Sequence, residues 1–234
     1  MFQLSITGAD NSVSVQKLQQ LTKQFSNVEF AILYFPEKDN QPRNPGISWR
    51  NEFFSSISKK NTALHLCGKT VFEQILETSF YQSPLFKELQ KAQRIQLNIN
   101  ARFDLFEHET IHKIYQKLLE HDFSIILQYN QRSKNWILPF LKNQNKDSSI
   151  HILLDSSLGK GVFTGIFEIP QELLEYSYPI GFAGGLNPEN IQQAYTETQK
   201  LQLHRYWLDL ESGARSHNQF DLEKVQLLCN TCFK

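Results

Sequence analysis

Gly181-Phe-Ala-Gly-Gly-Leu-Asn-Pro-Glu-Asn-Ile191 is the stretch that decides the fold. We expect an apolar strand over residues 179–183, a turn at Gly184-Gly185, and a helix that starts at Pro188 behind an Asn187 cap. A second stretch, Leu208-Asp-Leu-Glu-Ser-Gly-Ala214, repeats the strand and the turn of small residues.

Both turns place backbone N–H groups at or near a helix start, where they can face an anion. If the two strands are neighbours, the turns at Gly184-Gly185 and Ser212-Gly213 suit one phosphate group. The plainer interpretation is that glycine only permits a tight turn at each place.

Strand-like apolar runs alternate with amphipathic helical segments along the whole chain. The expected strands cover residues 2–7, 28–35, 63–67, 94–99, 123–128, 150–154, 179–183 and 206–210. Such alternation indicates a parallel sheet with right-handed crossovers. Eight units in 234 residues favour a closed (β/α)8 barrel over an open doubly wound sheet. We expect one barrel domain over residues 1–234, with its chemistry where strands end and loops begin.

The composition limits the kinds of binding partner that we expect. The 24 Lys and Arg residues balance the 24 Asp and Glu residues, so charge gives no case for nucleic acid or an anionic membrane as partner. No apolar run reaches the length of about twenty residues that a membrane span needs. The start of the sequence lacks the features of a signal peptide, and the three cysteines form no disulfide framework. We expect a cytoplasmic monomer or homodimer that takes a small molecule.

Several motifs resemble those of phosphoribosylanthranilate isomerase, a family of tryptophan biosynthesis. Leu153-Leu-Asp155 with Gly159-Lys-Gly161 resembles its sixth unit, and the two glycine-containing stretches resemble its seventh and eighth. Weaker similarities lie in the first half, at Ile6-Thr7-Gly8, Leu33-Tyr-Phe-Pro36, Pro42-Arg43 and Ile95-Gln-Leu97.

The resemblance implies an Amadori rearrangement that opens a phosphorylated furanose ring. An acid protonates the ring oxygen and a base removes a proton from the adjacent carbon. Asp155 matches the family's acid. Thr7 stands where the family has a cysteine base, and a threonine hydroxyl is a very weak base. Asp10 or Cys67 could supply the base instead.

The resemblance also implies the binding residues. Arg43 would bind the substrate through its guanidinium group. The phosphate would be held by Gly161, Gly184, Gly185, Ser212 and Gly213. No cofactor or metal is expected. Two family positions differ, because a histidine is replaced by Asn98 and a glutamate by Ala214 followed by Arg215.

A second hypothesis is a catalytically inactive or repurposed barrel that keeps the phosphate site, either as a sensor or protein-binding surface or for a different reaction step. On that view Thr7 marks a lost base. Asp155 could then be a helix cap or a partner of Lys160, Arg43 a solvated loop charge, and Cys67, with His65, a packing residue inside the barrel.

A third hypothesis is a zinc hydrolase, because His108-Glu-Thr-Ile-His112 matches the zinc-protease pattern. The segment is expected to be an outer helix, and no third ligand follows at the usual spacing, which favours a chance match. Cys229 and Cys232 have the spacing of a metal or redox pair, but we interpret them as part of a frayed C-terminal tail.

Overall fold

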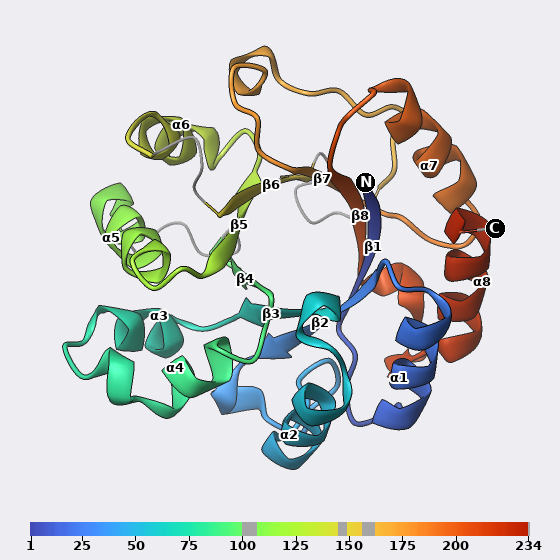
Figure 1. The fold of residues 1–234 in the computed structure, drawn as a ribbon, viewed down its shortest axis with the longest axis horizontal. Coiled ribbons are helices and arrows are strands. Elements are labelled where there is room, and N and C mark those ends of the chain that lie inside the picture. Colours follow the sequence, from blue (N-terminus) through green and yellow to red (C-terminus); the bar gives the residue numbers. More distant parts are fainter. Residues whose placement is uncertain (100–106, 145–148, 156–161, 234) are drawn as a thin grey trace.

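The computed structural model describes residues 1–99, 107–144, 149–155 and 162–233. Eight parallel strands form a closed barrel in chain order, with β8 returning to pair with β1 (Figure 1). The strands are β1 Phe2–Thr7, β2 Val28–Tyr34, β3 Thr62–Leu66, β4 Arg94–Leu97, β5 Ser124–Tyr129, β6 Ile150–Asp155, β7 Ile180–Ala183 and β8 Tyr206–Leu210. The predicted (β/α)8 barrel is confirmed.

Helices surround the barrel as a ring, in which α8 lies between α7 and α1 (Figure 1). The α-helices are α1 Val15–Gln24, α2 Ile47–Ser56, α3 Lys69–Leu76, α4 Pro84–Leu89, α5 His108–Leu119, α6 Lys134–Lys142, α7 Ile191–Lys200 and α8 Leu222–Phe233. Helix α5 packs an apolar stripe on the barrel, and this stripe includes Ile111, Ile114 and Leu118, all fully buried.

Two predicted helix boundaries are wrong. Helix α7 begins at Ile191 rather than Pro188, because the Asn187 side chain caps a preceding turn by accepting hydrogen bonds from the N–H groups of Glu189 and Asn190. The C-terminal segment is not a frayed tail. It continues α8 to Phe233, with the two cysteines facing the core.

The barrel interior holds a buried ion pair. Arg94 donates to Glu29 through two bonds, Nε to Oε2 at 2.8 Å and Nη2 to Oε1 at 2.6 Å, and both side chains are almost fully buried. Ser5 donates a further bond to Glu29 at 2.9 Å. The Arg94 guanidinium also lies 4.3 Å from the centre of the Trp207 ring. Glu29 and Arg94 therefore link the strands that carry them through charge-assisted bonds.

Trp207 fills the interior beside this pair, in contact with Ile126 and Leu153. The neighbouring strand makes room for it with Gly181, where an added Cβ would lie 2.0 Å from Trp207 Cε2. The indole therefore occupies the space that a side chain at Gly181 would take.

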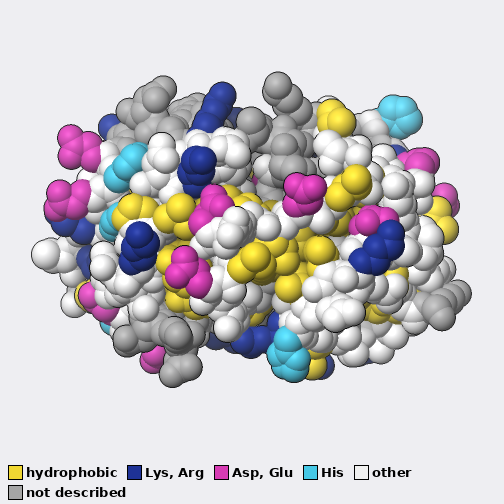
Figure 2. All heavy atoms as spheres, turned by 90° about the horizontal axis from the view of Figure 1, so that it is seen from above, with side chains coloured by type: hydrophobic (Ala, Val, Ile, Leu, Met, Phe, Trp, Pro, Cys, Tyr) yellow, Lys and Arg dark blue, Asp and Glu magenta, His cyan; other side chains and the backbone are white. Residues whose placement is uncertain are grey.

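The outer surface mixes charge types. On the face in Figure 2, acidic and basic side chains lie among uncharged ones around a central band of hydrophobic side chains. Among the helices of the described residues, none combines the length and apolarity that crossing a bilayer requires.

Replacing Arg94 with methionine should destabilise the protein strongly, since it leaves the Glu29 carboxylate buried without its partner. We expect the free energy of unfolding in urea to fall by about 3–5 kcal/mol. The double variant Glu29→Leu/Arg94→Met should recover much of that loss.

The matched control is Lys113→Met, which breaks the exposed pair between Lys113 and Glu109. It should leave the free energy of unfolding nearly unchanged. An Arg94→Met protein no less stable than this control would contradict the role given to the buried pair.

Candidate functional site

The candidate site is the rim of the barrel, meaning the carboxyl ends of the eight strands. Strand register places Asp155 opposite Ala183, and Ala183 opposite Asp209. Two carboxylates therefore lie in one row with a small side chain between them. With neighbouring strands about 4.8 Å apart, their Cα atoms are roughly 10 Å apart along this row.

Asp209 is bound to Thr7, whose hydroxyl donates to Asp209 Oδ1 at 3.1 Å. Burial raises the pKa of Asp209 to about 7, although the Thr7 and Ser5 hydroxyls and Arg94 act in the opposite direction. Thr7 itself is buried, whereas Asp209 is half-buried. Sequence reasoning gave Asp209 no role; the available signal was a carboxylate at an alternate position of an otherwise apolar strand.

Cys67 also lies at the rim, just after β3, but as a protonated thiol. Burial raises its pKa to about 11, despite a hydrogen bond that Asn98 Nδ2 donates to its sulfur at 3.2 Å. His65 lies two residues earlier, and burial with the nearby Arg94 charge lowers its pKa to about 3. Both side chains are therefore neutral near pH 7.

Asp10 anchors three loops of the rim. Its carboxylate accepts bonds from the Ser12 N–H at 2.9 Å and the Arg43 N–H at 2.6 Å, and pairs with Arg215 at 2.8 Å. Burial alone would raise the pKa of Asp10, but these bonds outweigh it and hold the pKa below its usual value. Arg215 also donates to the Gly8 carbonyl, so it ties the loop after β8 to the loop after β1.

Arg43 reaches the same part of the rim from the loop after β2. Its guanidinium pairs with Glu211 at 3.1 Å, and both side chains are about two-fifths exposed or slightly less. The structure thus brings Arg43, Asp10 and Glu211 together, with Arg43 still open to solvent.

The two glycine turns touch each other. Gly184 and Gly185 have φ values of 123° and 66°. A Cβ on Gly213 would lie only 2.0 Å from the carbonyl oxygen of Leu186, so the backbone after β8 packs directly on the backbone after β7. Ser212 is the first residue of the short 3-10 helix that follows β8. Gly161, the other residue assigned to phosphate, lies outside the described residues.

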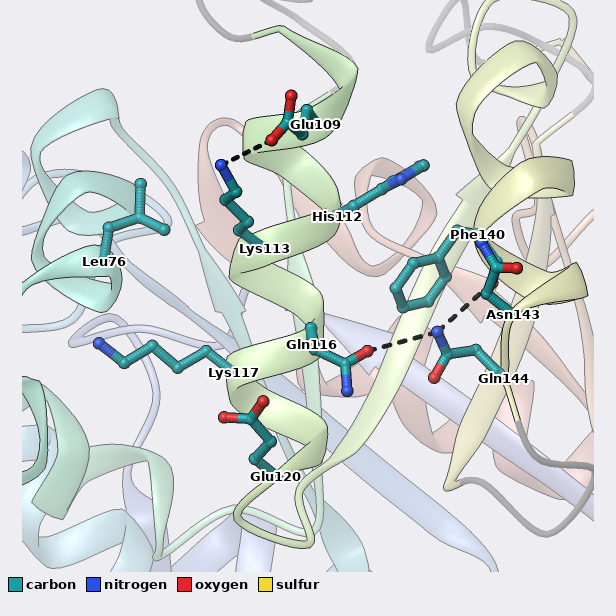
Figure 3. Close-up of a pocket in the computed structure, with 10 residues that line it drawn as sticks. All are labelled: Leu76, Glu109, His112, Lys113, Gln116, Lys117, Glu120, Phe140, Asn143 and Gln144. Carbon is teal, nitrogen blue, oxygen red and sulfur yellow. Dashed lines mark hydrogen bonds and ion pairs between the residues drawn. The ribbon is translucent and has the colours of Figure 1, made fainter.

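The zinc-protease pattern lies elsewhere, on the outer helix α5 (Figure 3). His112 Nε2 donates to the Trp136 carbonyl at 2.7 Å, while Glu109 pairs with Lys113 at 2.7 Å. Glu109, His112 and Lys113 line a groove of about 430 Å³ between α5 and α6. Within the described parts of the chain, no three metal-binding side chains come together. The geometry therefore does not favour the zinc hydrolase.

In the comparison with protein families, residues 84–231 match the model described as N-(5'phosphoribosyl)anthranilate (PRA) isomerase. The match covers more than half of the chain. The chain belongs to the phosphoribosylanthranilate isomerase family.

Curated relatives agree over a shorter stretch. The N-(5'-phosphoribosyl)anthranilate isomerases of two Desulfitobacterium hafniense strains, DCB-2 and Y51, are 35% identical over 118 aligned residues. That alignment covers 45% of this chain and 45% of each relative, so it spans less than half of their length.

Solved structures resemble the whole barrel. Phosphoribosyl anthranilate isomerase from Thermus thermophilus aligns with a TM-score of 0.58 and 16% identity, covering 98% of this chain and 97% of its own. A monomeric form of the dimeric Thermotoga maritima isomerase gives a TM-score of 0.59, with 99% and 98% covered, also at 16% identity. At such identity the likeness concerns the fold.

Replacing Asp10 with asparagine should destabilise the protein by about 3 kcal/mol at pH 7, because it removes the anion that Arg215 and the loops require. The native pKa of Asp10 is lowered, so its contribution is complete above the unfolded value near 4 and is lost as pH falls through the lower native value.

Urea unfolding of both proteins from pH 7 to pH 2.5 measures this, with the exposed Asp122→Asn variant as control. The gap between wild type and Asp10→Asn should narrow below pH 4. A gap that stays constant over this range would contradict the assignment.

Proposed function

We propose that the protein is a phosphoribosylanthranilate isomerase that acts at the rim of a single barrel domain. The observation that carries the proposal is the arrangement on three consecutive strands. Asp155 on β6 and Asp209 on β8 flank Ala183 on β7, and the turns after β7 and β8 are in direct backbone contact. A phosphate at the turns would leave its sugar within reach of both carboxylates.

Asp155 acts as the general acid in this proposal. It donates its proton to the furanose ring oxygen as the C1–O bond breaks, and the lone pair of the anilino nitrogen forms the C=N bond. The open-chain iminium then loses a proton from C2 to give an enolamine, which becomes the aminoketose. The reaction is an internal redistribution of hydrogen, so no redox cofactor is needed.

The binding groups divide between the two ends of the substrate. Gly184, Gly185, Ser212 and Gly213 present backbone N–H groups to the phosphate. Arg43 has a planar fork suited to the anthranilate carboxylate and is two-fifths exposed at the rim. The reaction would serve tryptophan biosynthesis in the cytoplasm, carried out by a monomer or homodimer.

Asp155→Asn should lower kcat on phosphoribosylanthranilate by about 10²–10⁴-fold, because the amide cannot donate the proton as an acid does. Binding should persist, seen as an increase in melting temperature with a non-reacting analogue of the product in which the ketone is reduced to an alcohol.

The matched control is Glu109→Gln, an acidic residue exposed on the outer helix α5. It should leave turnover unchanged. A wild-type protein that binds the analogue yet shows no turnover would contradict the proposal and support an inactive phosphate-binding barrel.

A further inference from the structure

The proposed isomerisation needs a base, and the three residues that the sequence offers are poorly suited. The Thr7 hydroxyl already donates a hydrogen bond to Asp209 Oδ1, at 3.1 Å. The Asp10 carboxylate is held by Arg215, Ser12 and the Arg43 backbone. Cys67 is a buried thiol whose raised pKa keeps it protonated near pH 7.

A fourth group has the required placement. Asp209 lies two residues after the interior residue Trp207 on β8, so its side chain faces the barrel interior, where it is half-buried. It lies in the same row as Asp155, two strands away, with only the Ala183 methyl between them. A substrate bound over Ala183 would therefore meet one carboxylate on each side, as an acid and a base must be placed when they act on neighbouring atoms.

Thr7 fixes the orientation of this carboxylate. It extends from the neighbouring strand β1 and donates to Oδ1 of Asp209. Threonine is restricted at χ1, so its hydroxyl offers a well-defined donor at this point. The family resemblance places the base at position 7. In this chain Thr7 instead orients the carboxylate of Asp209.

We propose that Asp209 is the catalytic base of the isomerisation and that Thr7 is a positioning residue that holds the Asp209 carboxylate. This inference rests on the proposed function, which assigns an acid but no proton acceptor; Asp209 is that acceptor.

The two carboxyl groups exchange protons with the substrate in turn. Asp155 gives its proton to the ring oxygen and becomes a carboxylate. The Asp209 carboxylate takes the proton from C2, and the electrons of that C–H bond form the C1=C2 bond while those of the C=N bond return to nitrogen. When the enolamine becomes the ketone, C1 gains a proton and the C2 hydroxyl loses one. Exchange with solvent restores both carboxyl groups.

The charges around Asp209 set when it can act. The Glu29 carboxylate and the Arg94 guanidinium lie beneath it, with opposite effects on its pKa, and the Thr7 and Ser5 hydroxyls lower that pKa. Burial is the largest effect and raises the pKa to about 7. The base is therefore half-deprotonated near neutral pH, and its proton affinity is close to the optimum for general base catalysis there.

Two histidines in the same interior add no charge near pH 7. His151 lies with its ring 5.8 Å from that of Trp207, and burial with the nearby arginines lowers its pKa to about 3. His65 is lowered to about 3 as well. On the rim side, Asp155 is the carboxylate in the row with Asp209. Neither histidine therefore changes its charge in the pH range in which Asp209 titrates.

The first test replaces Asp209 with asparagine, a group of the same shape that cannot accept the proton. Turnover of phosphoribosylanthranilate should fall by about 10²–10⁴-fold, while the reduced product analogue still raises the melting temperature. Turnover of Asp209→Asn within fivefold of wild type would overturn the inference.

The second test uses the pH dependence of kcat/KM and remains available if Asp209→Asn fails to fold. In wild type the rate should rise with pH through a midpoint near 7. Thr7→Val removes a bond that lowers the Asp209 pKa, so its midpoint should move to higher pH, whereas Thr7→Ser keeps the hydroxyl and the midpoint. Identical midpoints in Thr7→Val and Thr7→Ser would overturn the positioning role.

The outcomes separate the two proposals. A wild-type protein without turnover removes the isomerase itself. A wild-type protein with turnover that survives Asp209→Asn removes only the assignment of the base.

Discussion

The interior of this barrel depends on the buried ion pair between Glu29 and Arg94. Two buried charges are tolerated only when hydrogen bonds replace nearly all of those that they made with water. Here two hydrogen bonds join Arg94 to Glu29, and Ser5 donates a third to Glu29. Trp207 packs on the Arg94 guanidinium. Trp207 in turn requires a glycine on the next strand. The polar layer below the rim is thus specified by a few interlocking choices of side chain.

That layer determines the behaviour of the carboxylates above it. Asp10 and Asp209 are the same residue type at the same end of the barrel, yet their pKa values move in opposite directions. Asp10 receives hydrogen bonds from an arginine and from backbone N–H groups, which favour its charged form and lower its pKa. Asp209 receives hydroxyl groups and is dominated by burial. One carboxylate therefore fastens loops, while the other is suited to exchange a proton near pH 7.

The fold could be predicted from sequence because it depends on local signals. Apolar runs of strand length alternate with helical periodicity, and the glycine turns after 183 and 210 mark the last two units. The rim residues followed from the same reasoning, since strand ends are visible in sequence. The ion-pair partners could not be predicted from sequence, because they lie far apart in the chain. Arg94 pairs with Glu29, 65 positions away, and Arg215 pairs with Asp10, 205 positions away. The C-terminal helix was also underestimated, because only packing shows that the two cysteines near its end are buried.

The central claim is that substrate binds between Asp155 and Asp209, with its phosphate at the turns after β7 and β8. A crystal structure with the reduced product analogue tests this most directly. The account predicts the phosphate against the Gly184-Gly185 and Ser212-Gly213 turns, and the first two carbons of the sugar chain between the two carboxylates. An analogue bound away from the rim, for example in the groove between α5 and α6, would contradict it.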